Sequence, residues 1–240
     1  MSNSEMEQGL ESRDTASTAS ASAPASAPVG TDATPPGATP GRRYGGVGQA
    51  QREQARRAAL LDAATEVFGT VGFRRATVRS VCRLAKLNDR YFYAAFENLE
   101  QLLRATYAHH AQTLVDRLQA AIAASAPTLD ARLDAGLHTF FAFLRHPPAA
   151  RVLLLEVMGV SPETDQIYQR YIFEFARLIL GMADAPPPLG EDAQAQARIV
   201  GLALVGAMTH AGTAWVLMGY QETEACMVAS CRRVLRGALV

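Results

Sequence analysis

The sequence lacks most of the features that mark secreted proteins and enzymes. It has three cysteines, Cys82, Cys226 and Cys231, and their spacing shows no pairing pattern. Small secreted domains use cysteine far more heavily, so this usage suits a reducing cytoplasm, and Cys82 is expected to be a small buried residue within a helix.

Signatures of catalysis and metal binding are also missing. No pair of His, Cys or carboxylate residues has convincing metal-ligand spacing, and we find neither a nucleophile–base pair nor a glycine-rich phosphate loop. We therefore expect no enzyme, no cofactor and no bound metal. An enzyme built on a helical scaffold remains an alternative, which a screen for hydrolase or transferase turnover would test.

The chain has no net charge, but its charges are distributed unevenly. Residues 1–41 carry one basic and five acidic residues (net −4), residues 42–104 carry twelve and six (net +6), and residues 105–240 carry ten and twelve (net −2). A concentrated basic segment is what binding to a polyanion requires. The segment 42–104 is therefore the predicted nucleic-acid-binding region, although a solvated basic face would show the same excess.

Residues 1–41 contain no apolar run that could serve as a secretory signal. They are rich in Ala, Ser, Thr, Pro and Gly, and we interpret them as a disordered, low-complexity tail. Residues 42–52 follow as a basic arm. Arg42 and Arg43 in this arm could enter the DNA minor groove beside the main contact, and Arg52 would add positive field.

Residues 77–96 predict two short helices joined by a tight turn. Thr77 is a good N-cap, with Ser80 three residues later in the position of a capping box. Lys86 lies in the turn, and Asn88 is expected to cap the second helix. Within that helix Phe92 and Phe96 are four residues apart and should face inward, while Tyr93 should face outward.

In a helix-turn-helix, the first residues of the second helix reach base edges in the major groove. Arg90 suits a bidentate contact to guanine, Asp89 could accept from cytosine, and Tyr91 could contact a thymine methyl. Thr77, Lys86 and Tyr93 suit phosphate contacts, which fix the register. The full set predicted to contact DNA is Thr77, Lys86, Asn88, Asp89, Arg90, Tyr91, Tyr93, Arg42, Arg43 and Arg52.

The flanking segments extend this motif. An amphipathic helix over residues 59–73 precedes it, with Gly72 at its end and Phe73 packing back, and Asn98 begins another helix. The successive strings LLDAATEVFGTVGF, AT, YFYAAF and ENLEQLL resemble the N-terminal domain of the TetR family of transcriptional regulators. This family usually has Gly where this chain has Lys86, so Lys86 is expected to adopt a backbone conformation that favours Gly.

The resemblance implies an all-α protein of about nine helices. A three-helix DNA-binding domain would occupy residues 53–110, with its helix-turn-helix motif at 77–96, and a helical effector-binding and dimerisation domain would occupy residues 111–240. Helical periodicity without strand-like alternation supports this. The helices expected after the motif cover about 98–124, 129–145, 149–159, 161–182, 192–219 and 223–239.

The segment 199–218 is twenty residues long and contains no Asp, Glu, Lys or Arg. It is long enough to span a membrane, but Gly, Thr and His interrupt it, so we expect a buried helix and no membrane partner. In the resembled family, the last two helices of each subunit form a four-helix dimer interface. The residues placed there are Ala203, Ala207, Ala211, Ala214, Met227 and Val234, and burial within one monomer is the alternative.

Aromatic and methionine side chains, including Phe140 and Tyr168, are concentrated in the helices between residues 129 and 218. Most should be core, but pockets between helices are lined by the same side chains with a few polar groups added. Thr209 and Glu156 are polar residues in apolar surroundings, and His109 and His110 are expected at the surface. The predicted ligand-binding residues are His138, Phe141, Met158, Tyr171, Phe175, Met208, His210 and Trp215.

Together these features predict a cytoplasmic, sequence-specific DNA-binding regulator. We expect a homodimeric repressor that binds a pseudo-palindromic operator in double-stranded DNA and is released by a small hydrophobic effector, which the sequence does not identify. The alternative is a DNA-binding dimer whose C-terminal domain binds no ligand and serves only dimerisation or a protein partner.

Overall fold

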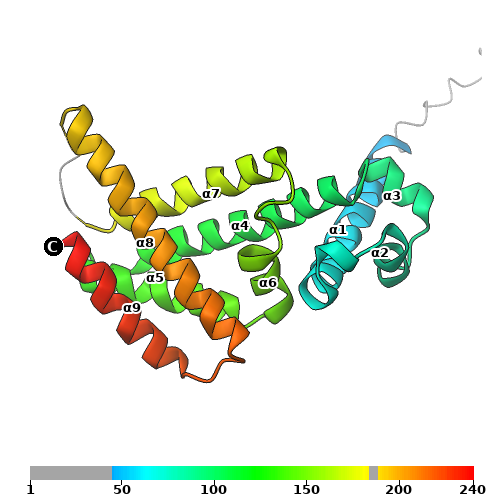
Figure 1. Ribbon diagram of the computed structural model, residues 1–240. Coiled ribbons are helices and arrows are strands. Elements are labelled where there is room, and N and C mark those ends of the chain that lie inside the picture. The colour runs from blue at the N-terminus through cyan, green and yellow to red at the C-terminus, as the bar shows by residue number, and fades with distance from the viewer. Residues whose placement is uncertain (1–44, 184–188) are drawn as a thin grey trace, which may run out of the picture. The chain divides into compact units, whose positions relative to one another are not determined.

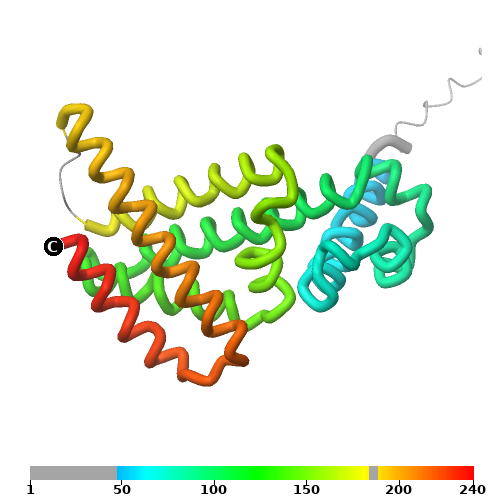
Figure 2. Tube along the Cα trace, viewed as in Figure 1, coloured from blue at the N-terminus to red at the C-terminus, as the bar shows by residue number. Residues whose placement is uncertain are grey.

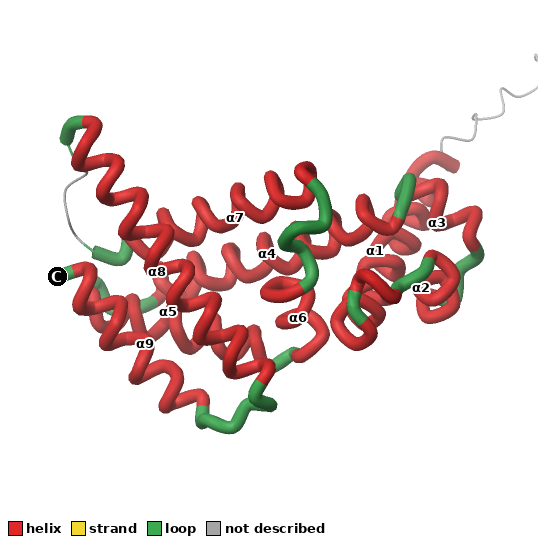
Figure 3. Tube along the Cα trace, in the orientation of Figure 1, coloured by secondary structure: helices red, strands yellow, loops and turns green. Residues whose placement is uncertain are grey.

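The computed structural model describes residues 45–183 and 189–240, and this part of the chain is helical with no strand (Figure 3). The predicted tail, Arg42 and Arg43 lie outside the described residues. Nine α-helices and one short 3-10 helix, η1, are present in the described ranges: α1 (Gly45–Val71), η1 (Phe73–Arg75), α2 (Val78–Ala85), α3 (Asp89–Ala95), α4 (Leu99–Ala124), α5 (Leu129–Leu144), α6 (Pro147–Leu155), α7 (Pro162–Leu180), α8 (Glu191–Leu217) and α9 (Glu224–Leu239). The all-α prediction is confirmed.

Helix α1 begins at Gly45, well before the predicted segment 59–73. The additional residues are mostly Gln, Glu, Arg and Ala with no proline, and these are strong helix formers. The helix ends where expected, because Gly72 has φ 85°, a value that side chains disfavour. Phe73 then packs edge-on against Phe68, with ring centroids 5.6 Å apart.

A small apolar core holds α1, α2 and α3 together. Leu60 and Phe68 of α1, Val81 of α2, and Phe92 and Phe96 at the end of α3 are all at most 2% exposed. The inward orientation predicted for the two phenylalanines of the recognition segment is therefore confirmed.

Helix α4 is shared between the two halves of the described chain. It packs against α1 and also against α5, α6 and α7, and Figure 1 shows it passing from the helix-turn-helix into the C-terminal helices. The Asn98 side chain caps its first turn by accepting from the Gln101 N–H at 2.8 Å, as the sequence indicates. A displacement of α4 would consequently move both its contacts with α1 and its contacts with the C-terminal helices.

The C-terminal helices follow in the predicted order, and the trace in Figure 2 shows α8 and α9 running beside one another. The sixth helix differs from its predicted range of 149–159. It begins at Pro147, because proline is tolerated in the first turn where its missing N–H would be unpaired. It ends at Leu155, so Met158 lies in the following turn and is 64% exposed.

Helix α8 is long and apolar enough to cross a membrane by length and composition alone, which is weak evidence for a membrane span. Within its most apolar window, 39% is buried. It packs against α5, α6 and α7, with Gly201 close to α7 and Gly212 close to α5. The remaining surface of α8 carries exposed apolar side chains, including Ile199 (66%) and Leu217 (61%).

Candidate functional site

The turn between α2 and α3 has the geometry expected of a position that favours glycine. Lys86 adopts φ 55° and ψ 37°, and its N–H donates to the carbonyl of Arg83 at 3.3 Å. The N–H of Leu87 closes the turn on the Cys82 carbonyl at 3.0 Å. These bonds satisfy carbonyls at the C-terminus of α2, so Lys86 is held with its side chain exposed.

Short-range capping fixes the start of both helices of the motif. The Thr77 hydroxyl accepts from the Ser80 N–H, and the Ser80 hydroxyl accepts from the Thr77 N–H, each at 3.1 Å. The predicted capping box is thus present. The Asn88 side chain accepts from the Tyr91 N–H at 3.3 Å, so its carbonyl oxygen is already engaged in holding α3.

The predicted base-contacting side chains gather at the start of α3. Asp89 and Arg90 are exposed, Tyr91 is half-buried, and Tyr93 is 61% exposed. Because Phe92 and Phe96 anchor the opposite side of α3 in the core, Arg90 and Tyr93 face away from the protein, whereas the Tyr91 ring packs against Arg56 of α1. This arrangement leaves the N-terminal end of the second helix free to enter a groove.

Two arginines of α1 stabilise α3 rather than only adding positive charge. The Arg56 guanidinium lies 4.1 Å from the centroid of the Tyr91 ring, within cation–π range. Arg57 lies 4.3 Å from the Phe96 centroid and donates to the Ala95 carbonyl at 3.1 Å. Arg52, by contrast, is exposed on α1 and donates to Gly48 of its own helix.

Cys82 has no sign of a reactive role. It is 3% exposed within α2, and burial, with a smaller contribution from the Asp89 carboxylate, raises the pKa of its thiol to about 11. A thiol with a raised pKa contains little of the nucleophilic thiolate at neutral pH. The packing role expected from the sequence is the one that the structure shows.

Helix α6 contacts the end of α1 at two points. At its start, the Pro148 backbone lies so close to Gly69 that a Cβ at Gly69 would come within 2.3 Å of the Pro148 Cα. At its end, Glu156 Oε2 accepts from the Phe73 N–H at 2.8 Å, while Glu156 Oε1 lies 3.8 Å from the Arg151 guanidinium. The sequence showed Glu156 as a polar residue in apolar surroundings. It did not show that its hydrogen-bond partner is Phe73, 83 residues earlier.

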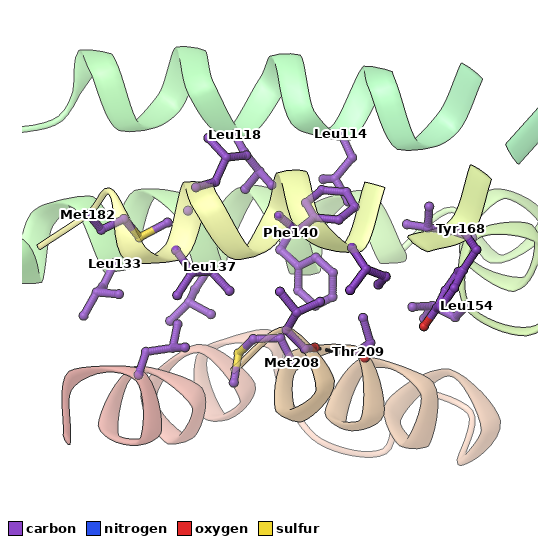
Figure 4. Close-up of a pocket in the computed structure, with 18 of the residues that line it drawn as sticks. Leu114, Leu118, Leu133, Leu137, Phe140, Leu154, Tyr168, Met182, Met208 and Thr209 are labelled. Carbon is purple, nitrogen blue, oxygen red and sulfur yellow. Dashed lines mark hydrogen bonds between the residues drawn. The ribbon is translucent and has the colours of Figure 1, made fainter. Parts of the chain in front are cut away.

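A cavity lies among the C-terminal helices, and Figure 4 shows its lining. Its unfilled space is about 70 Å³. Helix α4 contributes Tyr107, Leu114 and Leu118 to the lining, which the sequence analysis missed. Their spacing along α4 is helical, so this apolar face was recognisable, but the neighbour that it faces was not. Helices α5 to α9, and Met182 in the turn after α7, contribute the rest.

Two of the eight predicted ligand-binding residues, Phe175 and Met208, line this cavity, together with Phe140, Tyr168 and Thr209. The other six lie elsewhere. Phe141, Tyr171 and Trp215 are buried in the core, and the Trp215 indole N–H donates to the Glu222 carbonyl. His138, Met158 and His210 are exposed. Residue type identified helices that do line the cavity. Which face of each helix points into the cavity depends on how the helices pack.

The residues predicted for a dimer interface lie on α8 and α9, and all of them are at least partly exposed. Ala203, Ala207 and Val234 are exposed, and Ala211, Ala214 and Met227 are half-buried. Gly206, between the first two alanines, has nothing within 4 Å of the position a Cβ would take. A single chain therefore leaves this stripe of small side chains partly uncovered.

The described residues thus define a helix-turn-helix protein with a second, helical domain that contains an apolar cavity. Residues 60–106 match the family model of bacterial regulatory proteins of the tetR family. The chain carries a TetR-type DNA-binding domain, and the resemblance inferred from the sequence is confirmed. The proteins that this model describes are bacterial regulatory proteins, so the match over residues 60–106 supports a DNA-binding regulator.

Several solved structures share the fold of this chain. The fatty acid degradation regulator FadR from Bacillus halodurans aligns with a TM-score of 0.66 at 18% identity, covering 77% of this chain and 96% of that one. FadR from Bacillus subtilis, in complex with stearoyl-CoA, gives 0.64 at 18% identity over 76% and 99%. A tetR-family regulator from Streptomyces coelicolor gives 0.64 at 18% over 77% and 80%. No curated protein matches the chain.

Proposed function

We propose that this protein is a cytoplasmic, homodimeric transcriptional repressor that binds a pseudo-palindromic operator and is released by a small hydrophobic ligand. The observation that carries the proposal is the placement of Asp89, Arg90 and Tyr91 at the free N-terminal end of α3. This end lies in the segment with the +6 charge excess, which suits the phosphate backbone.

Dimerisation supplies the second half-site. The uncovered small residues of α8, such as Ala203 and Ala207, would let a helix of a second copy approach closely. A two-fold dimer of this kind would place two copies of α3 in successive major grooves, about 34 Å apart. An operator read in this way has two-fold sequence symmetry.

Ligand release rests on the position of α4. Tyr107 and Leu114 of α4 line the cavity, and the same helix packs against α1 of the DNA-binding domain. A ligand that fits the cavity better in one arrangement of α4 shifts the protein toward that arrangement. Stearoyl-CoA in the structure of Bacillus subtilis FadR supports an effector with a large apolar part.

The small unfilled space in the cavity, about 70 Å³, favours a second candidate function. In that case the C-terminal domain binds no ligand and serves only for dimerisation or for a protein partner. A thermal-shift screen of small hydrophobic compounds separates the two functions, because only a binding domain gains stability, with the logarithm of the ligand concentration.

Selection of genomic DNA fragments by the purified full-length protein, followed by footprinting, tests DNA recognition. The expected result is a protected pseudo-palindrome with half-sites one helical turn apart. Weak binding that depends steeply on salt and shows no preferred site would instead indicate an electrostatic patch, and the repressor proposal would be abandoned.

A further inference from the structure

The lining of the cavity contains no charged side chain. None of its nineteen residues is Asp, Glu, Lys, Arg or His. Burying an ionised group without a partner is strongly unfavourable. A carboxylate, phosphate or ammonium would therefore find no counter-charge in this space, and an ionised group of a ligand is excluded from it.

The two tyrosines of the lining lie toward one end of the cavity. In Figure 4, Tyr168 and Leu154 lie at one end, and Met182 and Leu133 lie at the other. Tyr107 belongs to this tyrosine end, because its ring centroid is 6.2 Å from that of Tyr168. The opposite end presents only aliphatic and thioether groups, and Thr209 lies between the two ends, beside Met208.

The tyrosine end and the middle of the cavity offer uncharged hydrogen-bonding groups. Tyr107 is 1% exposed, and its hydroxyl has no hydrogen-bond partner among residues 45–183 and 189–240. Burial raises the pKa of Tyr107, so its phenol keeps the proton and can donate it. The Thr209 hydroxyl donates to the Val205 carbonyl at 2.9 Å and has lone pairs left to accept.

The cavity must enlarge to admit a ligand of any length. Its unfilled space of about 70 Å³ is below the roughly 150 Å³ of an apolar cavity that admits benzene. Met182 and Met208 line it, and methionine is unbranched and repacks readily. The apolar end can therefore lengthen by rotation of these side chains, which suits a flexible alkyl chain.

We propose that the effector is an uncharged alkyl compound with a single polar oxygen group, such as a fatty alcohol, methyl ketone or ester. Its oxygen lies against Tyr107 and its alkyl chain extends toward Met182. This inference rests on the proposed function, because it names the class of ligand for the same cavity.

The test compares two probes that differ only in their polar group, 1-decanol and decanoate, by calorimetric titration of the full chain. A carboxyl group with a pKa near 4.3 must take up a proton to enter the cavity, so decanoate at pH 7.3 should bind about a thousandfold more weakly than 1-decanol. Between pH 7.3 and 5.5, decanoate affinity should rise about tenfold per pH unit, whereas 1-decanol affinity should stay constant.

Paired variants locate the polar group. Tyr107→Phe removes the hydroxyl without partner and should weaken 1-decanol binding about fivefold to tenfold. Tyr171→Phe is the matched control, because its hydroxyl already donates to the Ala108 carbonyl at 3.2 Å and Tyr171 is not part of the lining. The control should bind 1-decanol as the parent protein does.

The proposal is overturned if decanoate or decanoyl-CoA binds more tightly than 1-decanol at pH 7.3, or if none of the three binds. It is also overturned if Tyr107→Phe binds 1-decanol as well as the parent protein does. Operator release is measured separately by DNA mobility shift. Tight 1-decanol binding without release would contradict the repressor function while leaving the ligand class intact.

Discussion

Glu156 at the end of α6 accepts a hydrogen bond from the backbone N–H of Phe73, with a donor–acceptor distance of 2.8 Å. Phe73 begins η1, which leads directly into the helix-turn-helix, whereas α6 also carries Leu153 and Leu154 in the lining of the cavity. A single short helix thus contacts both the cavity and the DNA-binding domain. Coupling between the two can pass through α6 as well as through α4.

Replacing Glu156 with Ala should weaken this coupling. The side chain is 14% exposed, and losing a hydrogen bond to a charged group costs about 1.5–3 kcal/mol. We expect a lower free energy of unfolding by this amount. Ligand affinity should be unchanged, but the ligand-induced loss of operator affinity should become smaller.

Glu156→Gln is the matched control, because its amide oxygen can still accept from the Phe73 N–H. It should keep most of the ligand response in a DNA mobility-shift titration. Equal responses of the parent protein and Glu156→Ala would show that α6 does not transmit the signal.

Arg90→Ala should relax the sequence preference of the protein. Arg90 is exposed at the start of α3, and a bidentate arginine–guanine contact contributes about 1–3 kcal/mol of discrimination. We expect operator affinity to fall by this amount and the preference at one base pair per half-site to disappear. Competition binding with operator variants checks this, and an equal loss on all DNA sequences would contradict base reading by Arg90.

Lys86→Gly should affect stability and DNA affinity in opposite directions. Lys86 has φ 55°, a conformation that costs a non-glycine residue about 1–2 kcal/mol, so glycine should raise the free energy of unfolding by about 1 kcal/mol. If Lys86 contacts a phosphate, the same change should weaken binding to all sequences and lower the slope of log affinity against log salt by about 1. An unchanged salt slope would remove Lys86 from the DNA interface.

Ala207→Glu should separate the dimer into folded monomers. Ala207 is exposed on α8, so a charge there is tolerated in one chain but would be buried between two closely packed helices. Light scattering after size exclusion should show half the parent mass, with the helical circular dichroism retained. Ala120→Glu, at an exposed position on α4, is the control and should stay dimeric. A dimeric Ala207→Glu would move the interface elsewhere.

The sequence predicted best those features that depend on neighbours a few residues away. The caps at Thr77, Asn88 and Asn98 are all present, because a capping side chain bonds to the backbone of its own first turn. The left-handed backbone of Lys86 was likewise expected, because the resembled family usually has Gly at this position. The order and number of helices followed from periodicity and from the prolines and glycines between them.

Contacts between distant segments were not predictable in the same way. Met208 and Trp215 are both apolar residues of α8, yet only Met208 lines the cavity, whereas Trp215 packs against Phe141 with ring centroids 5.4 Å apart. His138 was predicted to bind ligand and instead lies 3.4 Å from Glu224. Helical spacing shows that a helix has an apolar face, but the partner of that face is set by the packing of the whole chain.

His110 is a further example, and it should make stability depend on pH. It was expected at the surface, but its Nε2 lies 2.8 Å from the Thr65 hydroxyl oxygen, joining α4 to α1. That hydroxyl donates to the Leu61 carbonyl at 2.9 Å, so Nε2–H of a neutral ring is the donor to Thr65. Burial, reinforced by the neighbouring His109 and His146, lowers the pKa of His110 to about 4.

The folded protein therefore binds this proton less readily than the unfolded chain, whose histidine pKa is about 6.5. The contribution of His110 is fully present above pH 6.5 and is lost as the pH falls from about 6.5 to 4, by about 3 kcal/mol in all. Urea unfolding of the parent protein between pH 7.5 and 5 should show this loss.

His110→Gln can still donate to Thr65 but does not titrate, so its free energy of unfolding should depend less steeply on pH. The exposed control His109→Gln should retain most of the parent slope. Equal slopes for the parent and His110→Gln would mean that His110 does not titrate between these states.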